Sequence, residues 1–268
     1  MPLAVCATPI GNLEDVTLRV LAELRVADTI LCEDTRRTRV LLDRHGIRAR
    51  LLSYHEHNEA QRTAELLPRL EAGERIALVS DAGLPGVSDP GARIVRAALE
   101  AGVPVTVLPG PSAVETALVV SGLEAEQYRF LGFLPRGEKQ LAALWEELRA
   151  WPWPAVAFES PQRLPASLRS LAAADPGREL AVCRELTKRF EEVVRGTAAE
   201  LAERFSEAPK GEIALVIGPG GATSSSAEDG ALRVVGELVE AGLPRRRAAD
   251  LVSGLTGISR NRLYSRSL

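Results

Sequence analysis

The sequence contains little of several features that mark particular classes of protein. Its 3 cysteines, Cys6, Cys32 and Cys183, are an odd number and lie far apart in the chain. Each is at or near an apolar segment, so we interpret them as buried reduced thiols and expect neither a disulfide framework nor a cysteine metal site. No apolar run approaches the length of a membrane helix, and the amino terminus MPLAVCATPIGN is unlike a signal peptide. We therefore expect a cytoplasmic protein with no membrane partner.

Lysine is also scarce, and so is net positive charge. Lysine occurs only at Lys139, Lys188 and Lys210, and the formal net charge is -3. A domain that binds naked nucleic acid over a broad surface is often strongly basic, so the overall charge argues mildly against such binding. The remaining positive charge is arginine, which suits forked contacts to phosphate, and local clusters therefore matter more than the sum.

One common ligand motif is missing. No G-x-G-x-x-G sequence follows the first apolar segment, where a nicotinamide-binding fold would place it. The commonest class of S-adenosylmethionine enzymes would place a related glycine-rich turn there, and that turn is absent too. The sequence Thr8-Pro9-Ile10-Gly11-Asn12 stands in its place, and on its own it is typical of an ordinary strand-to-helix turn.

What is present is a regular alternation of short apolar runs and helix-period stretches. Strands are predicted at 3–7, 29–32, 51–53, 76–79 and 105–108, and helices near 17–26, 36–45, 57–72, 91–101 and 113–121. Such alternation indicates an α/β domain, here 1–122, with a largely parallel sheet. Ligands bind such sheets at the carboxyl ends of the strands, where this sequence has polar loops rich in glycine and proline.

A second α/β domain is predicted at 123–218. The segment 128–134 is interpreted as a crossover into it, and strands are expected at 155–158, 180–184, 192–196 and 213–217. The stretch 218–226 has the composition of a linker. Residues 229–268 are predicted to form three short helices, the last beginning near Ser259, in a unit like a helix-turn-helix.

Seven motifs occur in order along nearly the whole chain. They are T-P-I-G-N at 8–12, E-D-T-R at 33–36, H-E-H-N at 55–58, S-D-A-G-x-P-x-x-S-D-P-G at 80–91, P-G-P-S-A at 109–113, G-F-L-P at 132–135 and R-E-L-T-K at 184–188. Together they closely resemble the small-subunit ribosomal RNA (cytidine-2'-O-)-methyltransferases of the tetrapyrrole-methylase superfamily. The resemblance implies a two-domain tetrapyrrole-methylase-like fold, usually a homodimer, that binds S-adenosylmethionine between its domains and methylates a cytidine ribose in small-subunit (16S) ribosomal RNA.

Carried over motif by motif, the resemblance implies cofactor-binding positions in both domains. They are Thr8, Pro9, Gly11, Ser80, Asp81, Ala82, Gly83, Ser112, Ala113, Glu159, Ser160, Leu186 and Ile213. For Asp81, a role in capping turn N–H groups competes with a role in the pocket, and its place just after a central strand favours the pocket.

Methyl transfer to a ribose hydroxyl also requires a base. Candidates are Asp34, Glu33, Lys188 and His57, with Asp81 a further acidic group, and the sequence does not choose among them. Glu33 and Asp34 are equally well explained as the start of a helix that Asp34 or Thr35 caps. Lys188 is equally consistent with an exposed lysine, and the resemblance alone places it in the cleft.

Two histidines close together raise the question of a metal. His55 and His57 would point the same way in an extended segment, which suits a metal ion, but a third ligand is missing from the sequence pattern. We expect metal-independent chemistry, with the histidines in a polar pocket or in contact with RNA.

Basic residues gather near the carboxyl terminus. Arg245-Arg246-Arg247 form one cluster, and Arg260, Arg262 and Arg266 form another with Asn261 and Tyr264 between them. A solvated helix surface is the usual meaning of such runs, and docking of RNA is the alternative. The predicted RNA-binding residues are Arg36, Arg245, Arg246, Arg260 and Arg262.

Two other functions compete with methylation of ribosomal RNA. A methylase of a small tetrapyrrole would share the fold and the methyl donor, but it would not require the H-E-H-N and E-D-T-R motifs or the basic carboxyl-terminal unit. A non-catalytic RNA-binding assembly factor would not need intact cofactor loops. The near-neutral charge favours a shaped ribosomal particle over loose RNA as the partner.

Overall fold

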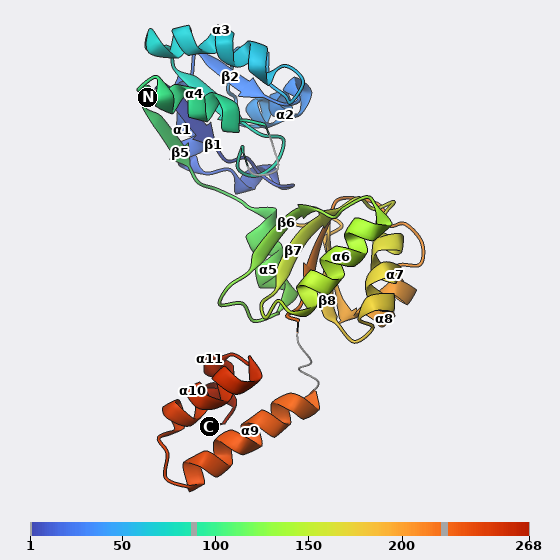
Figure 1. Ribbon diagram of the computed structural model, residues 1–268. Helices are drawn as coiled ribbons and strands as arrows, with labels where there is room; N and C mark the ends of the chain where they lie inside the picture. Colours follow the sequence, from blue (N-terminus) through green and yellow to red (C-terminus); the bar gives the residue numbers. More distant parts are fainter. Residues whose placement is uncertain (1, 87–89, 221–224, 268) are drawn as a thin grey trace. The chain divides into compact units, whose positions relative to one another are not determined.

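The computed structural model describes residues 2–86, 90–220 and 225–267, with the side chains of 225–229 left aside. Residues 87–89 of the long loop after the fourth strand, and 221–224 of the predicted linker, therefore lie outside this description. The chain divides into two compact units, Met1–Ala117 with Arg184–Glu192 and Leu118–Cys183 with Val193–Leu268. Figure 1 shows the helices and strands of both units.

The first unit is built on a five-stranded sheet in the order β3-β2-β4-β1-β5, in which every pair of neighbours is parallel. This confirms the predicted parallel sheet. Its strands are β1 Leu3–Cys6, β2 Thr29–Cys32, β3 Leu51–Ser53, β4 Ile76–Val79 and β5 Val105–Leu108. Because β4 pairs with both β1 and β2, the polar loops that follow these three strands emerge side by side at one edge.

Helices cover both faces of this sheet. Alternate side chains of β1 point to opposite faces, so that Ala4 and Cys6 join one core cluster while Leu3 and Val5 join the other. The first cluster receives apolar side chains from α1 and α2, and the second from α3 and α4. The helices of this unit are η1 Leu13–Asp15, α1 Leu18–Val26, α2 Thr35–Arg44, α3 Glu59–Glu71 and α4 Ala92–Glu100. The next helix, α5 Ala113–Ser121, crosses the division between the two units.

The second unit contains a mixed sheet in the order β6-β7-β10-β8-β9, in which β7 runs parallel to β6 and antiparallel to β10. The segment interpreted as a crossover is itself the strand β6. The strands are β6 Arg129–Phe133, β7 Ala155–Glu159, β8 Glu179–Arg184, β9 Glu192–Thr197 and β10 Ile213–Ile217, and the helices are α6 Glu138–Arg149, α7 Leu164–Ala174 and α8 Ala198–Arg204.

Three helices close the chain, as predicted: α9 Ser225–Glu240, α10 Arg245–Thr256 and α11 Arg260–Arg266. They share a small core of their own that includes Val235, Val252 and Leu263. Gly257 ends α10 in the left-handed conformation that such helix ends favour. The first of the three is 16 residues long and is therefore not short.

Two expectations about the whole chain can be compared with the structure. All three cysteines are buried thiols, and burial raises the pKa of the Cys6 thiol to about 12, which disfavours its nucleophilic thiolate form. No helix among the described residues is long and apolar enough to cross a membrane.

Candidate functional site

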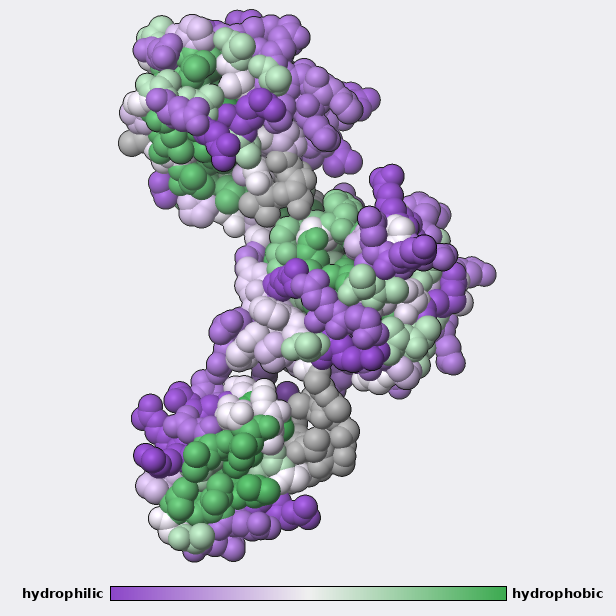
Figure 2. All heavy atoms as spheres, in the orientation of Figure 1, coloured by the Kyte–Doolittle hydropathy of each residue, from purple (hydrophilic) through white to green (hydrophobic). Residues whose placement is uncertain are grey.

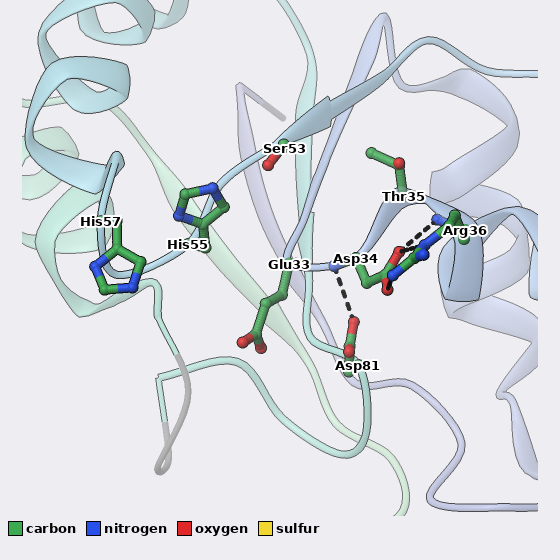
Figure 3. Close-up of a pocket in the computed structure, with 8 residues that line it drawn as sticks. All are labelled: Glu33, Asp34, Thr35, Arg36, Ser53, His55, His57 and Asp81. Atoms are coloured by element: carbon green, nitrogen blue, oxygen red, sulfur yellow. Dashed lines mark hydrogen bonds and ion pairs between the residues drawn. The ribbon is translucent and has the colours of Figure 1, made fainter.

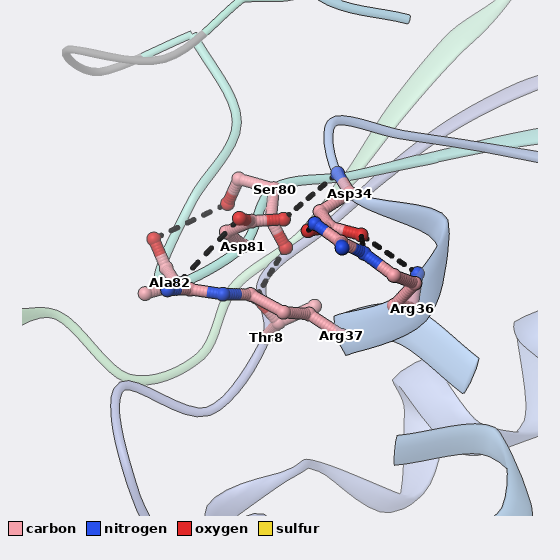
Figure 4. A network of polar contacts seen from close by, with 7 residues as sticks. All are labelled: Thr8, Asp34, Arg36, Arg37, Ser80, Asp81 and Ala82. Carbon is pink, nitrogen blue, oxygen red and sulfur yellow. Dashed lines mark hydrogen bonds and ion pairs between the residues drawn. The ribbon is translucent and has the colours of Figure 1, made fainter. Parts of the chain in front are cut away.

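The loops after β1 and β4 are joined directly to each other. Thr8 and Gly83 form a two-way backbone bridge, with N–H to oxygen distances of 2.8 and 3.1 Å. The Thr8 hydroxyl donates to the Ser80 carbonyl at 3.0 Å (Figure 4). The Ser80 hydroxyl donates to the Gly83 carbonyl at 3.1 Å. These hydrogen bonds of Thr8, Ser80 and Gly83, all predicted to bind cofactor, therefore join the loops after β1 and β4 into one double loop.

Asp81 connects this double loop to the loop after β2. One oxygen of its carboxylate accepts the backbone N–H of Asp34 at 3.1 Å, and the other lies 3.5 Å from the guanidinium of Arg37. The side chain also lines the pocket described below. Asp81 therefore satisfies a loop N–H and also lines the pocket, while its contact with the cofactor stays a prediction.

Asp34 begins α2. Its carboxylate accepts the backbone N–H of Arg36 at 2.8 Å and binds the guanidinium of the same residue in a fork, at 3.0 and 2.7 Å. These hydrogen bonds hold the pKa of the Asp34 carboxyl well below its usual range. Asp34 is therefore the helix cap that one reading of the sequence proposed, and its low basicity makes it a poor acceptor for a substrate proton.

A pocket of about 460 Å³ opens at this edge of the sheet (Figure 3). The loops after β2, β3 and β4 all contribute to it. Its lining residues are Glu33, Asp34, Thr35, Arg36, Ser53, His55, His57 and Asp81. The structure thereby brings together three of the four candidate bases and the predicted RNA contact Arg36. Ser53 was not predicted, although its place at the carboxyl end of β3 was a signal that could have found it.

Glu33 differs from the other acids of the pocket. Partial burial, and then the nearby negative charge of Asp81, raise the pKa of the Glu33 carboxyl above its ordinary value. Figure 3 shows its carboxylate turned into the space between Asp81 and the two histidines. The environment of the Glu33 carboxylate in this pocket therefore makes it more basic than an ordinary glutamate.

The histidines lie in a turn instead of an extended segment. The N–H groups of Asn58 and Glu59 both donate to the His55 carbonyl at 2.9 Å, and the two imidazole rings meet edge to face with centroids 5.9 Å apart. Nε2 of His55 lies 3.2 Å from the Asn58 amide nitrogen, whereas its buried Nδ1 has no hydrogen-bond partner among the described residues. Within the described ranges, no group of three or more His, Cys, Asp or Glu side chains is arranged to hold a metal ion.

Lys188 and Leu186, both predicted site residues, lie in the first unit but outside this pocket. They belong to the β8–β9 loop, Arg184–Glu192, which packs against the Thr8–Asn12 turn. The Lys188 ammonium pairs with the Glu185 carboxylate at 2.8 Å. Leu186 is buried.

Two further predicted positions, Ser112 and Ala113, lie at the start of α5. Ser112 precedes the helix, its carbonyl accepts the Thr116 N–H at 3.1 Å, and its hydroxyl bonds to the carboxylate of Glu115. Ala113 is the first residue of α5.

In the second unit, the predicted cofactor residues form a buried network. The Glu159 carboxylate, fully shielded from solvent, accepts the Ser160 N–H at 2.7 Å and the Ser167 hydroxyl at 2.6 Å, and lies 3.2 Å from the Arg163 guanidinium. Ile213 is its cross-strand partner. Both carboxylate oxygens are therefore already bonded, which makes Glu159 an organiser of the loop that follows β7.

The carboxyl-terminal arginines lie on the last two helices. Arg245 and Arg246 open α10, and Arg260 opens α11, where its guanidinium is 3.4 Å from the Asp250 carboxylate. Arg262 lies on α11 as well. Figure 2 shows an apolar area on these helices, and Leu251 and Leu255 of α10 are both exposed.

The chain is similar to proteins of known family. Residues 2–202 match the model of the Tetrapyrrole (Corrin/Porphyrin) Methylases. "Ribosomal RNA small subunit methyltransferase I" of Mesorhizobium japonicum is 45% identical, over 99% of this chain and 91% of that protein. The protein of that name from Escherichia coli O157:H7 is 40% identical, over 99% and 94%.

A solved structure shows the same fold at low sequence identity. Uroporphyrin-III C-methyltransferase from Thermus thermophilus, complexed with S-adenosyl homocysteine, matches with a TM-score of 0.56 and 19% identity, over 80% of this chain and 96% of that one.

Proposed function

We propose a function from the premise that this chain belongs to the ribosomal RNA small subunit methyltransferase I family of the tetrapyrrole methylases. It methylates the 2'-oxygen of a cytidine ribose in small-subunit ribosomal RNA. S-adenosylmethionine is the methyl donor. The observation that carries the assignment of roles is the pocket at the edge of the first sheet, which is lined both by a carboxyl group of raised pKa and by an exposed arginine.

The residues present fit a sulfonium donor. Glu33, Asp34 and Asp81 bring three carboxylates to the pocket, and the Asp34 charge is offset by Arg36. A sulfonium cation is stabilised by neighbouring negative charge. The Thr8–Asn12 turn and the Ser80–Gly83 loop, locked together beside this pocket, are the proposed supports of the donor in the first unit.

Glu33 is the proposed general base. A base works best when its pKa approaches the working pH, and Glu33 is the pocket acid whose pKa is raised. Asp34 is committed to the helix start and Asp81 to the Asp34 N–H. In the reaction, the 2'-oxygen forms a bond to the methyl carbon as the carbon–sulfur bond breaks, its electron pair stays on sulfur, and the hydroxyl proton passes to Glu33.

Arg36 is the proposed contact for the RNA backbone. It lines the pocket, its side chain is 89% exposed, and a guanidinium can bind phosphate through paired hydrogen bonds. The pocket volume lies within the range of roughly 300–1,000 Å³ typical of ligand sites. A ribose with its flanking phosphate would thus be held between Arg36 and Glu33, with collinear oxygen, carbon and sulfur supplying much of the rate.

The test is transfer of labelled methyl from S-adenosylmethionine to small ribosomal subunits of cells that lack the protein, followed by alkaline digestion of the RNA. Label in an alkali-resistant dinucleotide is expected, because a methylated ribose cannot assist cleavage. Glu33→Gln should lower kcat by about 100-fold or more with cofactor affinity retained. Glu100→Gln, which changes an exposed glutamate at the end of α4, is the matched control. No label with the wild-type chain, or full activity in Glu33→Gln, would contradict the proposal.

The same family resemblance supports two further proposals, that the chain acts as a homodimer and that it works in the cytoplasm on ribosomal subunits. Light scattering after size exclusion tests the first, and a monomer mass would contradict it. Cell fractionation tests the second.

A further inference from the structure

The β8–β9 loop contains an unusual backbone conformation. Glu185 and Thr187 have φ values of +52° and +64°, and they are the residues other than glycine with positive φ in the described part of the chain. This left-handed region is disfavoured for side chains with a Cβ, and most strongly for a β-branched residue such as threonine. Such conformations persist where surrounding contacts enforce them, and they cluster at functional sites.

Several hydrogen bonds enforce this conformation. The Thr187 N–H donates to the Glu191 carboxylate at 2.6 Å, and the Lys188 N–H donates to the Glu185 carbonyl at 3.0 Å. The Lys188 ammonium reaches the Glu185 carboxylate at 2.8 Å. At the base of the loop, Arg184 and Glu192 form an ion pair at 3.0 Å. The loop is therefore a closed structure with a fixed shape.

The strained residue contacts the Thr8–Asn12 turn. The Thr187 hydroxyl oxygen accepts the backbone N–H of Asn12 at 3.0 Å. A Cβ on Gly11 would lie 2.5 Å from Cγ of Lys188, 2.8 Å from the Leu186 carbonyl oxygen and 2.8 Å from the Thr187 hydroxyl oxygen. The absence of a side chain at position 11 thus permits the loop to lie directly on the turn.

We propose that Thr187 is a positioning residue for the methyl donor: held in its left-handed conformation by the β8–β9 loop, its hydroxyl fixes the Asn12 N–H and so sets the shape of the Thr8–Asn12 turn. This inference rests on the proposed function, in which that turn supports S-adenosylmethionine. Thr187 acts through the turn and does not itself react.

The two sides of the Thr8–Asn12 turn are thereby fixed by different partners. Thr8, at its start, is bridged to Gly83, and Asn12, at its end, is held by Thr187. A turn anchored at both ends loses little freedom on binding a ligand, which favours affinity. Removing the anchor at Asn12 should weaken binding of the donor and leave binding of the RNA acceptor unchanged.

The experiment measures the S-adenosylmethionine Kd of the full chain by calorimetry, together with KM for donor and acceptor. Thr187→Val keeps the branched shape and removes the hydroxyl acceptor, and it should raise the Kd and the donor KM by about tenfold, with kcat at saturating donor and acceptor KM unchanged. Thr187→Ser restores the hydroxyl and should return both values to within about twofold of wild type.

A pair of glycine variants keeps the test decisive if Thr187→Val folds poorly. Gly11→Ala should weaken donor binding by about tenfold or more, because its Cβ meets backbone and side-chain atoms of the loop. Gly236→Ala adds a Cβ on α9 that, apart from the backbone of its own helix, meets no heavy atom of the described residues within 4 Å, and it should leave the Kd unchanged. Unchanged donor affinity in Thr187→Val and Gly11→Ala would overturn the role of Thr187. A wild-type chain that fails to bind S-adenosylmethionine would instead overturn the proposed function itself.

Discussion

The carboxylate of Asp81 accepts the backbone N–H of Asp34 at 3.1 Å, across 47 positions of sequence. It thereby ties the loop after β4 to the residue that begins α2, and it places a negative charge beside Glu33. Asp81 thus shapes the pocket and raises the pKa of the proposed base at the same time.

Asp81→Asn should shift the pH dependence of methyl transfer. The pKa of Glu33 is raised first by burial and then by the Asp81 charge, so the wild-type rate should fall on the acid side at a pH above the ordinary glutamate value of 4.5. Removing that charge lowers the pKa of Glu33, and the acid limb of kcat should move to lower pH. An acid limb that stays in place in the variant would show that another group is titrating.

Asp34 should contribute to stability in a manner that depends on pH. Its folded-state pKa lies below the ordinary value of 3.8, so its stabilisation is complete above that value and is lost as pH falls through the lower folded-state pKa. Asp34→Ala should lower the Tm at neutral pH and flatten the acid dependence of the Tm. Asp34→Asn, which can still cap α2, should lower the neutral Tm less. Melting curves recorded from pH 7 downward follow the loss that begins near pH 3.8 and check this. Equal Tm values for the two variants at neutral pH would contradict it.

Gly220→Ala should destabilise the second unit. A Cβ at Gly220 would overlap the carbonyl oxygens of Leu148 and Arg149, so the backbone would have to shift. Overpacking of this kind costs about 1–3 kcal/mol, measurable by urea unfolding. Gly177→Ala serves as the matched control, because beyond its chain neighbours an added Cβ meets no heavy atom of the described residues within 4 Å. If both variants unfold at the same urea concentration, the close approach at Gly220 does not affect the free energy of unfolding.

Replacing Arg260 and Arg262 by glutamine should weaken binding of ribosomal RNA and reduce its salt dependence. Each lost phosphate contact lowers the slope of log K against log salt by about 1. Both residues lie on α11, whose buried Leu263 is left unchanged, so the helix should still pack. Binding is measured by filter retention at several salt concentrations. An unchanged slope would assign these arginines to a solvated surface, and donor affinity should be unaffected in either case.

The strands of the first sheet were predictable because each is a short apolar run bounded by turn residues. Four of them have the predicted bounds, and β1 ends at Cys6, one residue early. The mixed direction of the second sheet was not predictable, because the direction in which β10 pairs with β7 leaves no mark on the sequence of either strand. The strand β6 was expected only as a connecting segment.

The candidate site was predictable as a set of loops but not as a set of roles. The E-D-T-R motif fits a base and a helix start equally well, and only the hydrogen bonds of Asp34 to Arg36 distinguish them. Thr187 gave no local signal, since left-handed backbone is usually marked by glycine or asparagine and here is imposed by contacts distant in sequence.

The assignment of Arg184–Glu192 to the first unit bears on how the protein is made. The turn that follows β1 is synthesised before the loop that packs on Gly11, because residues 118–183 of the second unit lie between them in the sequence. The N-terminal motif therefore reaches its final shape late, and a fragment that stops at Ala117 would leave the turn without the contact at Asn12. Division of this chain for expression in pieces should keep residues 184–192 with the amino-terminal part.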